Sequence, residues 1–415
     1  MIDRINDFRY RDFYILGLAL LLFGILIDNP YNNITGLYNI IKSPSILLTD
    51  YMEIGGVGSA FINAGLMTLL SSRIAQKSGA RITGALIASI FIVTGFSFFG
   101  KNVINSIPLM LGVYAYVKFI KSEISNYVHI LLFVTGISPV VSLFMFGLDF
   151  SLFLSFSLAI LVGLIIGFII IPLSNAMLVF HEGYSLYNVG FSLGIIGLFI
   201  AGILRMFDIE IPTLRFEYIG NDTYSFAFLL AFSVGMIILG FIQNGGLKGY
   251  DHIISQSGKL ITDFTLTTNK GLVLVNMGLM GLISIIFVKI SGGVINGPLA
   301  GGIFTVIGFA AFGKHPKNVL PVMAGVFIAS TLNKYEPSST DAILVALFAT
   351  TLAPIAGEFG VLAGILAGFL HKAAATNVGI IHGGMNLYNN GLAGGLVAGL
   401  MVPLLKNFNE RFRRD

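Results

Sequence analysis

Apolar and polar positions alternate along this chain on the length scale of a lipid bilayer. Apolar runs such as FYILGLALLLFGILI (13–27), SLFLSFSLAILVGLIIGFIII (151–171) and YSFAFLLAFSVGMIILGFI (224–242) are separated by short polar joints. Runs of this length predict membrane-spanning helices. In the first half of the chain the pattern predicts spans near 13–29, 55–74, 81–99, 103–120, 128–147, 151–171 and 186–205. The expected fold is therefore an all-α polytopic membrane protein.

Two segments of this half break the pattern. Residues 36–52 are amphipathic and interrupted by Ser, Gly and Pro, and residues 172–183 are short and polar. Backbone can leave the helix inside a membrane only where protein surrounds it. We therefore predict that 36–52 and its counterpart 249–265 are re-entrant or broken half-helices that dip into the membrane and end near Asp50 and Asp263. Residues 172–183 are predicted to be too short or polar to cross.

The chain also carries an internal duplication. Shifting the sequence by 213 residues aligns 36–117 with 249–330, with 31 identities in 82 positions and no gap. Farther along, the shift falls to 201, where HEGYSLYNVGF (181–191) matches HGGMNLYNNGL (382–392). Such self-similarity indicates two copies of one structural unit. We assign repeat 1 to residues 1–215 and repeat 2 to residues 216–415.

The predicted span count sets the relative orientation of the two repeats. Seven spans in each repeat, about 7+7 in all, would make the second copy enter the membrane upside down, which gives inverted-topology repeats. Lys and Arg concentrate on the cytoplasmic side of membranes. With a cytoplasmic N-terminus, most basic loops fall inside and the acidic joint between the copies falls outside, so both termini are predicted to be cytoplasmic. The exceptions are Lys101, Arg205, Arg215, Lys289 and Lys334.

Composition supports a membrane protein and excludes several other classes. Hydrophobic residues make up 55% of the chain and charged residues 11%, with a mean hydropathy of +0.89. The chain has no cysteine, which excludes disulfides and cysteine-ligated metals. The net charge of +4 fits cytoplasmic anchoring better than nucleic-acid binding. Nucleotide-binding and hydrolase motifs are absent, so we expect no cofactor, no metal and no enzymatic activity.

Asp50 and Asp263 form the first duplicated polar pair. Each follows a threonine and precedes a Gly-rich span. An ionisable residue inside a membrane is costly unless it faces water, a cation or a partner, so a role in binding the solute is one interpretation. The alternative is that each aspartate caps the helix that follows it.

The second pair is His181 and His382, each followed by a Tyr-Asn dipeptide. Their neighbours are Tyr187 and Asn188 in the first copy and Tyr388 and Asn389 in the second. These side chains could line a polar path beside glycine breaks. Alternatively, the histidines could lie in loops at the water interface with the tyrosines as belt aromatics. Glu182 has no acidic counterpart, which makes it a candidate for coupling.

The third pair is Lys101 and Lys314, each at the end of an apolar span. Snorkelling of the amines to the membrane surface is the simpler interpretation. The alternative is an entrance ring that attracts anions. Asn63 and Asn276 also recur, and each could hydrogen-bond a solute or a neighbouring helix.

The order of a dipping segment, a polar corner and a Gly-rich span, with corners SLYNVGFSLG (185–194) and NLYNNGLAGG (386–395), resembles the urea-transporter and ammonium-channel group in layout. That resemblance implies inverted repeats, half-helices and transport without energy coupling. The overall pattern also resembles an uncharacterised family of bacterial multi-pass membrane proteins, a domain of unknown function.

These features predict a channel or permease for a small polar solute in the plasma membrane of a bacterium, with its path between the two repeats. Two alternatives remain: a secondary transporter of an organic solute coupled to H⁺ or Na⁺, and a membrane enzyme or complex subunit that uses His181, Glu182 or His382. The expected partners are the lipid bilayer, the solute and further copies of the chain in a homo-oligomer.

Overall fold

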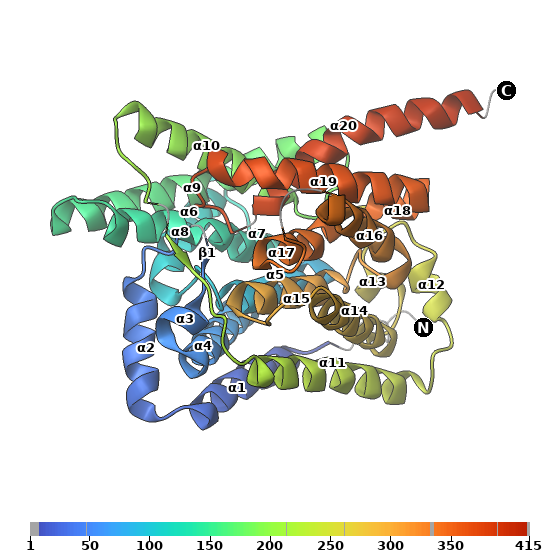
Figure 1. The fold of residues 1–415 in the computed structure, drawn as a ribbon, viewed down its shortest axis with the longest axis horizontal. Helices are drawn as coiled ribbons and strands as arrows, with labels where there is room; N and C mark the ends of the chain where they lie inside the picture. Colours follow the sequence, from blue (N-terminus) through green and yellow to red (C-terminus); the bar gives the residue numbers. More distant parts are fainter. Residues whose placement is uncertain are drawn as a thin grey trace.

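The structure is a computed structural model that describes residues 8–46, 48–212, 214–260, 262–332, 336–387 and 389–412, apart from the side chains of residues 380, 389, 409, 411 and 412. It is mostly helical (Figure 1). The elements of the first half are α1 (Tyr10–Ile27), α2 (Pro30–Lys42), β1 (Leu48–Thr49), α3 (Tyr51–Gly55), α4 (Val57–Lys77), α5 (Gly84–Phe96), α6 (Val103–Phe119), η1 (Ile124–Asn126), α7 (Val128–Phe133), η2 (Val134–Ile137), α8 (Ser138–Ser142), η3 (Leu143–Gly147), α9 (Leu152–Phe180) and α10 (Asn188–Met206).

The second half repeats this order. Its elements are β2 (Arg215–Phe216), α11 (Thr223–Asn244), α12 (Tyr250–Ile254), α13 (Phe264–Thr267), α14 (Lys270–Ile290), α15 (Gly297–Phe309), α16 (Pro316–Leu332), α17 (Thr340–Ala349), η4 (Thr350–Leu352), α18 (Ala353–Phe359), α19 (Val361–Ile381) and α20 (Asn389–Phe412). The 213-residue shift carries α4, α5 and α6 onto α14, α15 and α16 with the same bounds. The sequence duplication is therefore a duplication of helices.

Nine helical segments among the described residues are long and apolar enough to cross a membrane, which confirms a membrane-embedded helical protein. The helices α5 and α15 are shorter, with 13 residues each. At about 1.5 Å per residue they extend only about 20 Å, less than the roughly 30 Å of a bilayer core. The spans predicted near 81–99 and 103–120 are thus short helices joined by a buried turn.

Two other local predictions are wrong. The segment 172–183 is not separate from the span predicted to end at residue 171, because α9 continues through Pro172 to Phe180. The segment 36–52 does not form a half-helix ending at Asp50: α2 ends at Lys42, and β1 pairs in parallel with β2 just before Asp50. In 249–265, α12 ends at Ile254, well before Asp263. Pro44 explains the early end of α2, because the residue before a proline disfavours helical backbone.

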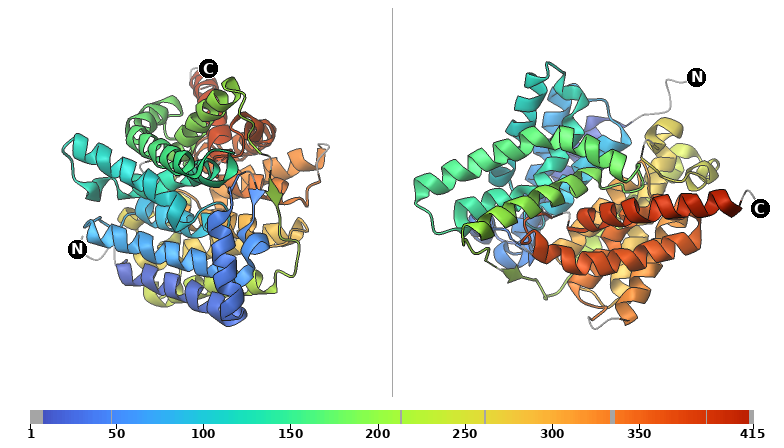
Figure 2. Two further views of the ribbon diagram at one scale, coloured as in Figure 1. Left: turned by 90° about the vertical axis from the view of Figure 1, so that its left-hand side faces the viewer. Right: turned by 90° about the horizontal axis from the view of Figure 1, so that it is seen from above.

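The elements form three layers. In Figure 1, α1 and α11 lie along one edge, α5 and α15 lie in the middle, and α10, α19 and α20 lie along the opposite edge. Seen from above in Figure 2, α9, α10, α19 and α20 lie next to one another in that outer layer. Many apolar side chains of α1, α9 and α11 are exposed, which suits helices that face lipid.

The two halves meet through matched helices. The middle-layer helices α5 and α15 pack closely, and a Cβ at Gly95 would lie only 2.7 Å from the carbonyl oxygen of Gly301. In the outer layer α10 packs on α20, where a Cβ at Gly391 would lie 2.7 Å from the carbonyl carbon of Gly190. Small residues permit this backbone contact inside a membrane. The boundary predicted at residue 215 falls within β2 and stays a prediction.

Candidate functional site

The most unusual feature of the structure is a pair of buried lysines. Lys101 lies in the turn between α5 and α6 (residues 97–102), and Lys314 lies in the matched turn between α15 and α16 (residues 310–315). We call these the first and second lysine turns. Both lysines are 0% exposed. The interpretation as snorkelling anchors is therefore wrong. Neither lysine should be used among the basic residues that indicate the cytoplasmic side.

Both amines lie over an aromatic ring at the end of the preceding helix. Lys101 Nζ is 5.2 Å from the ring centre of Phe96, and Lys314 Nζ is 4.9 Å from that of Phe309. The 213-residue shift also relates these two phenylalanines. A ring face attracts a cation, so both copies place an amine in the same local setting.

The hydrogen bonds of the two amines differ. Lys314 Nζ donates to the hydroxyls of Tyr187 and Thr350, each at 2.7 Å. Lys101 Nζ has no hydrogen-bond partner in the part of the chain that the structure describes. Matched lysines thus occupy two different environments.

Asn63 and Asn276 hold the two turns in place. The Asn63 side-chain amide donates to the carbonyls of Ser97 (2.7 Å) and Lys101 (2.9 Å). The Asn276 amide donates to the carbonyls of Ala310 and Lys314, both at 2.8 Å. These bonds satisfy buried carbonyls of the two turns, which lie outside the hydrogen-bond ladders of the flanking helices. Of the two predicted roles, the structure supports contact with a neighbouring protein segment.

Asp50 and Asp263 act as caps. The Asp50 carboxylate accepts from the backbone N–H groups of Met52 (2.9 Å), Gly297 (3.1 Å) and Tyr218 (3.1 Å). It therefore caps α3 in its own repeat and α15 in the other. Carboxylates at helix N-termini satisfy orphan N–H groups and complement the helix dipole.

Asp263 repeats this arrangement with the repeats exchanged. Its carboxylate accepts from the N–H and hydroxyl of Thr265 at 2.9 and 2.6 Å, and from the N–H of Gly84 at 2.9 Å. It thus caps α13 and the start of α5. The capping alternative accounts for both aspartates, because their observed contacts are with the protein itself.

The histidines do not converge. His181 Nε2 lies 3.0 Å from Asn188 Oδ1, and the N–H of Ser185 donates to His181 Nδ1 at 3.4 Å. His382 lies instead at the wall of a cavity described below. Tyr388 and the side chain of Asn389 lie outside the described residues.

We call residues 181–187 and 382–387 the first and second histidine loops. Each histidine loop packs against the lysine turn of the opposite repeat. A Cβ at Gly100 would lie 2.5 Å from Leu387, and one at Gly313 would lie 3.0 Å from Leu186. Gly100 also has φ of +76°, which favours glycine. Leu387 and Leu186 are related by the 201-residue shift, so the two loops exchange equivalent contacts.

The same loops bond to breaks in two central helices, which sequence reasoning missed. The N–H of Leu186 donates to the carbonyl of Thr351 at 3.0 Å, and the N–H of Leu387 donates to that of Gly136 at 2.9 Å. These carbonyls belong to the 3₁₀ turns η4 and η2, which interrupt long apolar helices. The signal was present as VTGISP (134–139) and ATTLAP (349–354), which align at a third shift of 215 residues.

Two cavities flank this central region. The larger, about 1040 Å³, includes Phe99, Leu387, His382 and the joint between the repeats. The smaller, about 510 Å³, includes Phe312, Leu186, Tyr187 and Glu182. No described residue lines both. Repeat-related pairs that line the smaller and larger cavity respectively include Phe312 and Phe99, Leu186 and Leu387, Gly183 and Gly384, Ser174 and Ala375, Asn175 and Thr376, and Ile130 and Val345.

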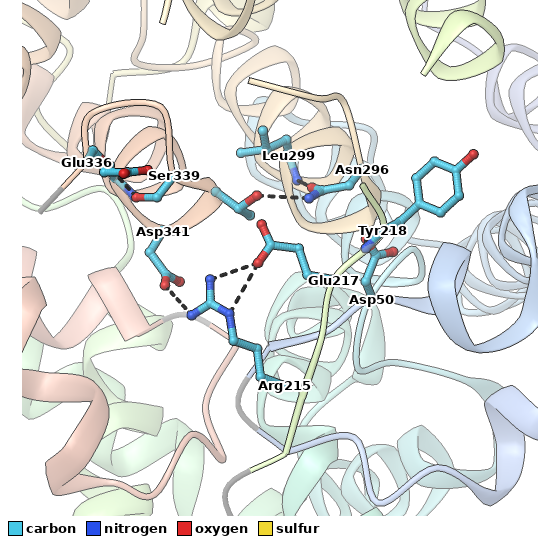
Figure 3. A network of polar contacts seen from close by, with 11 residues as sticks. Asp50, Arg215, Glu217, Tyr218, Asn296, Leu299, Glu336, Ser339 and Asp341 are labelled. Atoms are coloured by element: carbon cyan, nitrogen blue, oxygen red, sulfur yellow. Dashed lines mark hydrogen bonds and ion pairs between the residues drawn. The ribbon is translucent and has the colours of Figure 1, made fainter. Parts of the chain in front are cut away.

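Ion pairs lie at the walls of both cavities. Arg215 lines the larger one and joins Asp341 (2.6 Å) to Glu217 (2.9 Å), as Figure 3 shows. Behind it, the same segment reaches the Asp50 carboxylate through the N–H of Tyr218. At the smaller cavity Glu182 pairs with Lys406, and both side chains are partly exposed. Glu182, which has no acidic counterpart in the second repeat, is thus held in a partly exposed ion pair at the smaller cavity.

The described residues contain no group of three or more His, Asp or Glu side chains placed to hold a metal ion. The fold brings the Lys314 amine together with the hydroxyls of Tyr187 and Thr350 beside the second helix break, and it buries the matched Lys101 amine in the first lysine turn. This arrangement can hold a charged or polar molecule between protein dipoles.

One comparison with known proteins produced a match. The model of a family described as "Protein of unknown function (DUF1576)" matches residues 29–206 and 242–407. A search of curated proteins and a search of solved structures found no match. The expected likeness to an uncharacterised membrane family is confirmed, whereas the likeness to the urea-transporter and ammonium-channel group gains no support.

Proposed function

We propose, from the premise that the chain belongs to the DUF1576 family of proteins of unknown function, that it is a membrane permease for a small polar solute. The solute path runs between the two repeats, from one cavity through the lysine turns to the other. The proposal includes no catalytic activity.

The first support is the relative direction of matched helices. Gly95 of α5 approaches Gly301 of α15, whereas Gly308 of α15 approaches Phe91 and Ala88 of α5. Contacts that run forward in one helix and backward in the other belong to an antiparallel pair. In Figure 1, α1 leads to α2 at one end of the molecule, and α11 leads to α12 at the opposite end. We infer that the repeats have inverted topology, as in many secondary transporters.

The second support, which carries the proposal, is the pair of cavities lined by repeat-related residues. Inverted repeats that can exchange conformations produce such cavities on opposite faces of a membrane. The unequal volumes fit a molecule that is more open toward one face. Because the cavities share no described lining residue, the geometry favours a gated permease over a continuously open channel.

An enzymatic alternative would need the candidate acid–base residues to meet in one cavity. Glu182 lines the smaller cavity and His382 the larger, while the His181 imidazole bonds to Asn188. This separation favours transport. Coupling to H⁺ or Na⁺ and assembly into a homo-oligomer stay predictions.

Cysteine labelling tests the proposal directly, because the chain has no cysteine of its own. Asn175 and Thr376 are related by the 201-residue shift and line the smaller and the larger cavity. Asn175→Cys and Thr376→Cys are exposed to a membrane-impermeant maleimide in sealed vesicles of each orientation. With cytoplasmic termini, we expect Thr376→Cys to react from the outer face and Asn175→Cys from the cytoplasmic face.

Two controls keep this result interpretable. A cysteine at Lys77, an exposed position at the end of α4, reports the orientation of the vesicles, and denatured protein reports the maximum labelling. Reaction of both cavity cysteines from the same face would contradict the inverted arrangement and the permease with it.

A further inference from the structure

We propose that the two lysine turns bind the anionic group of the solute, so that the permease carries a small oxyanion such as a carboxylate. This inference rests on the proposed function and adds the charge of the substrate. It also gives Lys101 and Lys314 a common role as substrate-binding residues.

The burial of both amines is the first step. Lysine is almost never fully buried unless it is paired, because removing an ammonium group from water is very costly. Both lysines are 0% exposed, yet no ion pair among the described residues includes either one. An ionisable residue in this position inside a membrane protein marks a functional site.

The buried carboxylates do not neutralise these amines. The Asp50 carboxylate is 0% exposed and accepts from three backbone N–H groups at 2.9 to 3.1 Å. Asp263 is likewise bonded to Gly84 and Thr265. The aspartates therefore offset helix N-termini. Any negative charge that balances the ammonium form of these lysines therefore comes from another molecule.

Each turn lies behind a narrow barrier of apolar side chains. Leu387, which contacts the first turn at Gly100, lines the larger cavity together with Phe99. Leu186, which contacts the second turn at Gly313, lines the smaller cavity together with Phe312. Displacement of one leucine and one phenylalanine would connect each cavity with its own lysine turn. The barriers are related by the repeat, so one gating movement can occur at either face.

The second turn shows which groups would accompany the amine. Lys314 Nζ is bonded to the hydroxyls of Tyr187 and Thr350, and Tyr187 itself lines the smaller cavity. The amine and the Tyr187 hydroxyl are suited to an oxyanion, since both can donate hydrogen bonds to its oxygens. The Thr350 hydroxyl donates its proton to the Leu347 carbonyl and therefore acts by positioning the amine. The ring of Phe348 contacts the rings of both Phe96 and Tyr187, with ring centres 5.9 Å from Phe96 and 6.0 Å from Tyr187. This aromatic wall separates two binding positions.

Solute counterflow into proteoliposomes tests the inference. The probes are radiolabelled acetate, oxalate and phosphate as anions, urea and glycerol as neutral solutes, and choline as a cation. We expect wild-type protein to move at least one anion at least tenfold faster than the neutral and cationic probes. Lys101→Met and Lys314→Met each remove an amine while keeping the side-chain volume, and each should lower anion flux at least tenfold.

Lys317→Met is the matched control. Lys317 lies three residues after Lys314 but is exposed, so its loss should leave anion flux unchanged. Thermal unfolding in detergent shows whether each variant is folded. If a lysine variant does not fold, two other measurements decide the question. These are the preference of the wild-type protein for anions and the protection of Thr376→Cys from maleimide labelling by the transported anion.

The outcomes separate the two proposals. Faster movement of urea, glycerol or choline than of every anion, retention of anion flux in both lysine variants, or movement of none of the three anions would overturn the anion inference. The permease would survive these results if the two cavity cysteines still react from opposite faces. Reaction from a single face would overturn the permease itself.

Discussion

The two lysine turns are built alike but are engaged differently. In both, an asparagine holds two backbone carbonyls and a phenylalanine lies under the amine. Among the described residues, the amine of the second turn bonds to the hydroxyls of Tyr187 and Thr350, whereas the amine of the first turn has no hydrogen-bond partner. The duplicated residues therefore define the frame of the turn, and the surrounding loops decide how the amine is used.

The sequence explains part of this difference. Thr351 in the second helix break corresponds to Gly136 in the first. The Thr351 hydroxyl accepts from the N–H of Tyr187 at 2.9 Å and lies 3.2 Å from the hydroxyl of Ser185. A glycine cannot make these contacts. The first helix break, at Gly136, thus lacks a hydroxyl that could hold the loop after His382. That loop lines the larger of the two cavities.

The largest expected effect concerns the caps that join the repeats. Asp50→Ala leaves three N–H groups unpaired, and Asp50 is 0% exposed. Each unsatisfied buried donor costs about 1–3 kcal/mol, so we expect a loss of about 4 kcal/mol of unfolding free energy. Asp263→Ala should cost about 2 kcal/mol, because Asp263 is only partly buried and holds two N–H groups. Denaturant titration in detergent measures both.

Equal losses in these two variants would contradict the asymmetry between the caps. Asp341→Ala serves as a control, because that aspartate is exposed and pairs with Arg215 at the surface. We expect a change below about 1 kcal/mol there, which is usual for an exposed ion pair.

The two asparagines should contribute alike through their carbonyl contacts, and this would sharpen the comparison. The hydrogen bond that Asn276 Oδ1 also accepts from the Tyr250 hydroxyl at 2.9 Å should add at most about 1 kcal/mol. Asn63→Ala and Asn276→Ala each leave two buried carbonyls unpaired. The expected cost is about 2–3 kcal/mol in each variant. A difference above about 1 kcal/mol in denaturant titration would show that the frames of the two turns are not equivalent.

Sequence patterns predicted the parts of this arrangement that depend on side-chain polarity and on duplication. Apolar runs identified the long helices, and the repeat paired Asn63 with Asn276 and Lys101 with Lys314. Capping by the aspartates was one of two interpretations. The cap on the helix that directly follows each aspartate could be predicted from the Thr-Asp dipeptide before that helix. The cap on the opposite repeat did not follow, because it depends on where α5 and α15 begin in space.

The depth of the lysines was beyond a linear pattern. A lysine at the end of an apolar run has the same sequence whether the run ends at the membrane surface or in a buried turn. The distinguishing quantity is helix length: α5 and α15 have 13 residues, too few to cross a bilayer core. The helix breaks were missed for a similar reason. A 3₁₀ turn of three or four residues barely changes a hydropathy profile.

The lysines themselves should respond in opposite directions. Lys101→Met removes a buried amine that has no hydrogen-bond partner among the described residues, so we expect about 1 kcal/mol of stabilisation. Lys314→Met removes two hydrogen bonds and leaves the Tyr187 hydroxyl with one contact fewer, so we expect about 1 kcal/mol of destabilisation. Thermal unfolding in detergent, without added anions, compares the two. A shift of the same sign in both variants would contradict the difference between the turns.

The smallest expected effect isolates the hydroxyls of the helix breaks. Thr350 and Thr135 correspond, and each hydroxyl donates to a carbonyl one turn earlier, that of Leu347 or Leu132. Only Thr350 also accepts from a lysine amine. Valine keeps the shape of threonine, so Thr350→Val should cost about 1 kcal/mol more than Thr135→Val. In a Lys314→Met background that excess should vanish, because the bond that produces it is already gone. A double-mutant cycle that retains the excess would assign it to local helix geometry, and the second turn would then differ from the first in position rather than in bonding.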